Sequence, residues 1–183
     1  MKHWNFLMLS SGLILLSCQS TIYNDSFDSP QSKIPPASII ELHLSLSFTV
    51  GFSRSFIQFG QPVSLNNIDE REPYCQFIRY EPPAALETQR TVQPDDFIIT
   101  HSTQTIENSL SGFSMKISIG SKGLGDRDDQ TLSSILKLRS EKQAEIVKLK
   151  CSIFAQPDEW NYLSVNQIKG VLGHLATIKF PVE

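Results

Sequence analysis

The sequence lacks an excess of positive charge and any long basic block. Its 16 lysines and arginines stand against 19 aspartates and glutamates, for a net charge of −3. Nucleic-acid-binding proteins neutralise phosphates with clustered Lys and Arg, so the sequence does not indicate this class. Long apolar runs are scarce too, because the only one lies at the N-terminus, and this excludes a polytopic membrane protein. Nine glycines and ten prolines in 183 residues exclude a collagen-like chain and leave one globular domain with a targeting segment.

The N-terminus has the order of parts found in a secretory signal peptide. Lys2 precedes an apolar stretch, residues 4–16, that is too short to span a bilayer. The stretch ends in Leu15-Leu16-Ser17-Cys18, which resembles the lipobox of bacterial lipoproteins. In that family the signal peptide is removed just before the cysteine, and the cysteine sulfur carries the lipid. The alternatives are an ordinary cleaved signal peptide with a chance cysteine, or an anchor that is never cut.

The lipobox resemblance implies three regions. Residues 1–17 are expected as a lipoprotein signal peptide, residues 18–37 as the lipidated Cys18 with a flexible tether, and residues 38–183 as a β-rich periplasmic domain. Palmitate and other acyl chains on Cys18 would hold the protein to the membrane. In the family, Asp after the cysteine favours retention in the inner membrane. Gln19 therefore favours the periplasmic side of the outer membrane.

Hydrophobic patterning predicts that the domain is mainly β. Strands are expected over 42–48, 54–59, 75–80 and 146–154, and in a hairpin that turns at Pro94-Asp95-Asp96. Residues 132–138 are expected as a short helix or an irregular segment. Ser164 and Gln167 form a capping box that predicts the start of a C-terminal helix. The expected fold is a small sandwich or open barrel closed by this α-helix.

Short segments in a fixed order resemble a group of small uncharacterised proteobacterial lipoproteins. They include Glu41-Leu42-His43, Gly60, Pro73-Tyr74-Cys75-Gln76-Phe77, Val92-Gln93-Pro94 and Leu149-Lys150-Cys151. The resemblance covers most of the mature domain and implies a periplasmic location and a disulfide between Cys75 and Cys151. It implies no activity.

The cysteine count favours the same disulfide. With the lipid on Cys18, two thiols remain in an oxidising compartment, where an even number favours pairing. Cys75 and Cys151 both lie on apolar faces of predicted strands, so they can meet in the core. The alternative is two buried free cysteines that act as small apolar residues.

No group of residues has the pattern of a catalytic or metal site. The mature chain has three histidines, His43, His101 and His174, which are far apart in sequence, so no metal ligation is expected. Segment 51–55, Gly-Phe-Ser-Arg-Ser, approaches the G-x-S-x-G elbow of hydrolases, but it ends in Ser and precedes a strand. The loop over 120–129 lacks the spacing of a phosphate or calcium loop. We therefore expect no cofactor and no enzymatic activity.

Lysines and arginines are frequent between residues 137 and 150, where a solvated strand face is the usual explanation and anionic lipid or glycan is the alternative. The sequence as a whole predicts a lipid-anchored envelope accessory or binding protein that acts through protein or glycan contacts. The alternative is a carrier or inhibitor that binds a small ligand in the mouth of a β-barrel, and a hydrolase ranks last. A membrane, through the lipid, and an envelope protein or glycan are the expected partners; nucleic acid is not.

Overall fold

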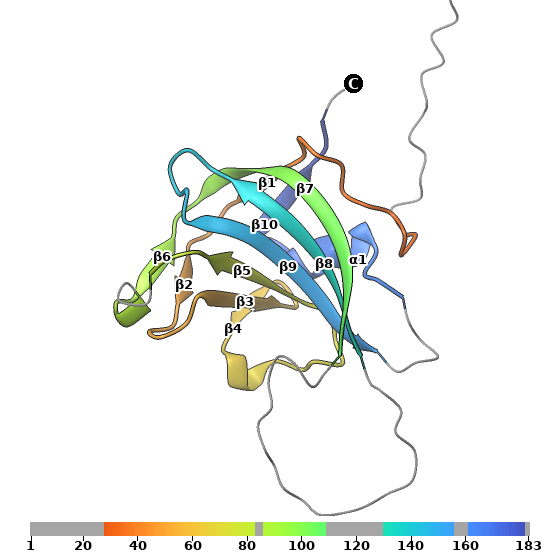
Figure 1. Cartoon of the computed structure of the whole chain (residues 1–183), viewed down its shortest axis with the longest axis horizontal. Helices are drawn as coiled ribbons and strands as arrows, with labels where there is room; N and C mark the ends of the chain where they lie inside the picture. The colour runs from red at the N-terminus through yellow and green to blue at the C-terminus, as the bar shows by residue number, and fades with distance from the viewer. Residues whose placement is uncertain (1–27, 83–85, 109–129, 156–160, 182–183) are drawn as a thin grey trace, which may run out of the picture.

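The computed structural model describes residues 28–82, 86–108, 130–155 and 161–181 (Figure 1). The predicted signal peptide and Cys18 lie outside these residues, and so does the loop over 120–129.

Eight antiparallel strands form one sheet that curls into a half-barrel (Figure 1). Their order across the sheet is β10-β1-β7-β8-β9-β5-β3-β4. The bounds are Ile39–Leu42 for β1, Arg54–Gln58 for β3, Gln61–Val63 for β4, Tyr74–Arg79 for β5, Asp95–Asn108 for β7, Gln130–Arg139 for β8, Ile146–Ala155 for β9 and Ala176–Lys179 for β10. The mainly β fold is therefore confirmed, and the sheet has the form of an open barrel.

A smaller second sheet and two helical segments complete the fold. Strands β2 (Leu46–Phe48) and β6 (Arg90–Val92) pair only with each other, and a 3₁₀ turn, η1, spans Leu65–Asn67. Helix α1 (Val165–Leu172) begins with the predicted capping box, in which the Ser164 hydroxyl accepts from the Gln167 amide and the Gln167 side chain accepts from the Ser164 amide. The C-terminal helix is therefore confirmed.

The core lies on the inner face of the curled sheet, where α1 packs. Val165, Ile168, Val171 and Leu172 of the helix join one buried cluster with residues from the strands, among them Phe77, Phe97 and Leu149. The Cys75–Cys151 disulfide belongs to the same cluster, and both cysteines are fully buried. Helix side chains thus fill the inside of the half-barrel.

Two glycines set the distance between the sheet and the helix. Phe59 and Gly60 form the β3–β4 turn with φ of 52° and 71°, which is the signature of a type I′ hairpin. The Gly60 amide donates to the Val171 carbonyl at 2.9 Å. A Cβ on Gly173 would lie only 2.7 Å from the Gly60 Cα, so glycine is required for this contact.

Three predicted elements are wrong. Residues 42–48 are not one strand, because β1 ends at Leu42, the chain crosses to the second sheet at β2, and Leu44 between them is 45% exposed. The hairpin at Pro94 is also wrong, because β6 pairs with β2 whereas β7 pairs with β1 and β8. Residues 132–138 belong to strand β8. The sequence does not show this clearly, because Ser134 is polar but occupies a buried position on the inner face of the strand, where a period-two pattern would have an apolar residue.

Candidate functional site

The turn between β2 and β3 presents two apolar side chains to solvent. Val50 is 52% exposed and Phe52 is 40% exposed. Gly51 has φ of 83° at the third position of the turn, where a type II turn needs glycine, and the Phe52 amide donates to the Thr49 carbonyl. The turn is therefore built by local chemistry, and Phe52 is displayed at a defined place.

Contacts from outside the turn fix it further. The Gly51 amide donates to the Leu86 carbonyl at 2.7 Å. The Arg79 guanidinium donates to the Phe52 carbonyl at 3.3 Å, and the Arg79 amide donates to the Ser53 carbonyl. An exposed aromatic ring on a fixed backbone loses little conformational entropy when it is buried by a partner.

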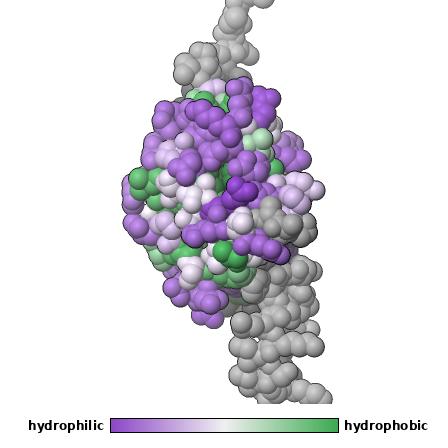
Figure 2. Space-filling view, turned by 90° about the vertical axis from the view of Figure 1, so that its left-hand side faces the viewer, coloured by the Kyte–Doolittle hydropathy of each residue, from purple (hydrophilic) through white to green (hydrophobic). Residues whose placement is uncertain are grey.

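A groove runs beside Phe52. It consists of two surface hollows, of about 140 and 180 Å³, that share Phe52, Arg54, Phe56 and Leu65. Val63 of β4 and several hydroxyl groups complete the first hollow, and Leu86 lines the second. We call this surface the Phe52 groove. On the face of the domain in Figure 2, hydrophilic residues dominate and hydrophobic residues form small separate patches.

A third hollow, of about 370 Å³, is polar and lies where β1 meets the β6–β7 corner. Its lining residues are Glu41, Leu42, His43, Pro94, Asp95, Asp96 and Lys142. Glu41 is paired with Lys179 at 2.7 Å, and the His43 imidazole lies 2.7 Å from the Thr177 hydroxyl. These groups already have protein partners.

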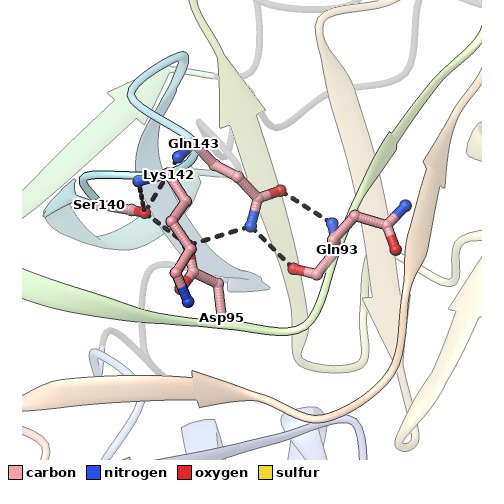
Figure 3. A network of polar contacts seen from close by, with 5 residues as sticks. All are labelled: Gln93, Asp95, Ser140, Lys142 and Gln143. Atoms are coloured by element: carbon pink, nitrogen blue, oxygen red, sulfur yellow. Dashed lines mark hydrogen bonds and ion pairs between the residues drawn. The ribbon is translucent and has the colours of Figure 1, made fainter.

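Figure 3 shows the polar network beneath this hollow. The Gln143 side chain binds both backbone groups of Gln93, accepting from its amide at 2.8 Å and donating to its carbonyl at 2.9 Å. It also donates to the Asp95 carboxylate, which accepts from the Ser140 hydroxyl as well. The network therefore ties the β6–β7 corner to the loop between β8 and β9.

The Asp95 carboxylate is held in its charged form by this network. Burial raises its pKa, but hydrogen bonds from Ser140, Gln143 and the Asp96 backbone, together with the Lys142 charge, outweigh that effect and lower the pKa below its ordinary value. Lys142 lies 3.7 Å from the carboxylate. Because three donors already bind this carboxylate, we interpret it as a structural link between the corner and the loop.

Of the residues that the sequence analysis singled out, the structure brings the two cysteines together but does not gather the three histidines into one site. Cys75 and Cys151 are opposite each other in the β5–β9 pair and are joined by the predicted disulfide. His43, His101 and His174 lie on different parts of the fold, and in the described residues no group of three or more His, Cys, Asp or Glu is placed to hold a metal.

The Phe52 groove is a site that the sequence analysis missed. Its lining residues come from β2, the β2–β3 turn, β3, β4 and η1, which are consecutive along the chain, and from Leu86, which is the one distant contribution. The one local signal was Gly51 beside two apolar residues, Val50 and Phe52, in a region flanked by strands.

Within the described ranges, no helix is both long and apolar enough to cross a membrane. The chain matches no protein-family model, no curated protein and no solved structure at a significant level.

Proposed function

We propose that this chain is a lipid-anchored envelope protein, held on the periplasmic side of the outer membrane, whose domain is a non-catalytic binding module. The Phe52 groove is the observation that carries this proposal. Large aromatic side chains that are exposed beside a hollow are the usual anchors of protein–protein interfaces. A partner protein would cover Phe52 and fill the hollows next to it.

The partner segment has a definite chemistry. Phe56, Val63 and Leu65 supply apolar contacts, and Arg54 adds an exposed cation to the same groove. Among the described residues Arg54 forms no ion pair. A segment with an apolar side chain followed by a carboxylate matches this pattern, because the carboxylate can bind the guanidinium with two hydrogen bonds.

Other features favour this reading over the alternatives. A ligand carrier needs room inside the barrel, and here the side chains of α1 occupy that space. Strand addition at the β4 edge is disfavoured, since Pro62 lies in the middle of that strand and has no amide hydrogen. On this side of the sheet we therefore assign the partner to the groove and not to the β4 edge.

Photo-crosslinking in cells tests the groove. A benzoylphenylalanine at Phe52 should give one discrete crosslinked species. The same residue at Phe59, which is 68% exposed and lies on the β3–β4 turn outside the groove, is the matched control. Arg54→Glu should reduce the Phe52 crosslink about tenfold, as expected for loss of a charged anchor contact. Equal crosslinking at the two positions, or no product at Phe52, would contradict the proposal.

Metabolic labelling tests the anchor. Cys18→Ala should abolish incorporation of a labelled fatty acid and leave the protein unprocessed or unanchored, because the thiol is the site of attachment. Cys75→Ala is a control: it lacks the disulfide, but its labelling per amount of protein should match that of the wild-type chain. If Cys18→Ala incorporates as much label as the wild type, the protein is not a lipoprotein.

A further inference from the structure

The outer face of the sheet carries a continuous basic surface. Lys137 of β8 is opposite Lys148 of β9 in the strand register and opposite His101 of β7 on its other side. Arg139 lies two residues further along β8 and therefore points to the same face. All four side chains are exposed, on the side of the sheet opposite to Leu136 and Leu138 of the core. We call His101, Lys137, Arg139 and Lys148 the basic face.

On the basic face, Lys137 and Lys148 place like charges directly opposite each other. Residues directly opposite in antiparallel strands have Cα atoms about 4.5–5.5 Å apart, and like charges there destabilise a sheet. Within the described residues, none of these four side chains forms an ion pair. Lys142 and Lys150, nearby in sequence, each have one, with Asp95 and Glu107. The repulsion is a local cost that an anionic ligand would remove.

We propose that the basic face binds an acidic polysaccharide that lies across the strands. Neighbouring strands are about 4.8 Å apart, which is comparable with the length of one sugar unit. A polymer with a carboxylate on successive sugars would therefore meet His101, Lys137 and Lys148 in turn, and one with a carboxylate on alternate sugars would meet His101 and Lys148. This site is separate from the Phe52 groove and does not depend on the function proposed for it.

The composition of the basic face favours a hydrated polymer over a bilayer. Surfaces that bind membranes combine cations with large exposed apolar side chains that enter the interface. The two most exposed phenylalanines, Phe52 and Phe59, flank β3, which is separated from β8 by β9 and β5 in the strand order. Ile78, the neighbour of Lys148 on β5, is partly buried, and Ile98, opposite Arg139 on β7, is 36% exposed, so the apolar surface beside the basic side chains is small.

The test measures binding of the full chain, in non-ionic detergent, to short polygalacturonate by isothermal titration. The double variant Lys137→Gln/Lys148→Gln should weaken binding about tenfold or more, because two charge-assisted contacts are lost. The slope of the logarithm of affinity against the logarithm of salt concentration should fall by about two. Lys142→Gln, which removes a lysine already paired with Asp95, is the matched control and should bind like the wild type.

A stability measurement separates loss of binding from loss of folding. Lys148→Glu places a carboxylate opposite Lys137, so it should raise the melting temperature by about 1–3 °C while it abolishes polygalacturonate binding. Absence of binding by the wild-type chain, or equal loss in Lys142→Gln, would overturn the proposal. Equal binding to polyglutamate, or to micelles that contain phosphatidylglycerol, with the same dependence on Lys137 and Lys148, would overturn it in favour of an acidic protein or a membrane.

Discussion

Removal of the disulfide should lower the free energy of unfolding by about 4–5 kcal/mol in the double variant Cys75→Ala/Cys151→Ala. The bond joins residues 76 positions apart. It limits the conformations of the unfolded chain, and loop-closure entropy for a loop of this length corresponds to about 4.5 kcal/mol. A typical domain is stable by only about 5–15 kcal/mol, so this change removes a large part of the total. Urea denaturation followed by circular dichroism measures it.

The matched control is Cys18→Ala, which removes the one cysteine outside the domain and should leave the urea midpoint unchanged. Reduction of the disulfide in the native protein should be slow, because both Cys75 and Cys151 are fully buried and a reductant reaches them only after the sheet opens. Two free thiols in the denatured, unreduced wild-type protein would contradict the pairing, and so would a double variant that is as stable as the wild type.

Local signals in the sequence were sufficient for several parts of the fold. The capping box at Ser164 depends on residues three apart, and it predicts the start of α1 correctly. The two cysteines stand in period-two patterns that put them on apolar faces, and their pairing needs only that β5 and β9 be neighbours. These features are governed by short-range geometry or by chemistry with few alternatives.

Features that depend on distant contacts could not be predicted in this way. Leu44 continues the alternation of Leu42 and Leu46, yet the chain leaves one sheet for the other at this point, and nothing local marks the crossing. Ser134 is buried on the inner face of β8, where the sequence pattern favours an apolar residue. The residues that line the Phe52 groove lie between 47 and 66, apart from Leu86, but the hollows between their side chains form only when the turn, β3, β4 and η1 pack against one another.

Arg79 connects that groove to the interior. Its guanidinium stacks over the Phe48 ring, with 4.8 Å between the central carbon and the ring centroid, and lies 2.8 Å from the Glu81 carboxylate. It also donates to the Phe52 carbonyl, so one side chain joins β5, the second sheet and the β2–β3 turn. The Arg79 side chain is 1% exposed and that of Glu81 is 13% exposed, which means that both charges have been taken out of water.

Arg79→Met should therefore destabilise the domain by about 3–5 kcal/mol, because the Glu81 carboxylate stays buried and loses its close, buried cation. Arg90→Met is the matched control: Arg90 lies 4.0 Å from the same carboxylate but is 58% exposed, so its loss should cost less than about 1 kcal/mol. Adding Glu81→Gln to Arg79→Met should restore part of the stability, since the unpaired charge is then gone. Denaturant titration of the four proteins gives the comparison. An Arg79→Met protein within 1 kcal/mol of wild type would contradict this and would mean that solvent reaches the Glu81 carboxylate.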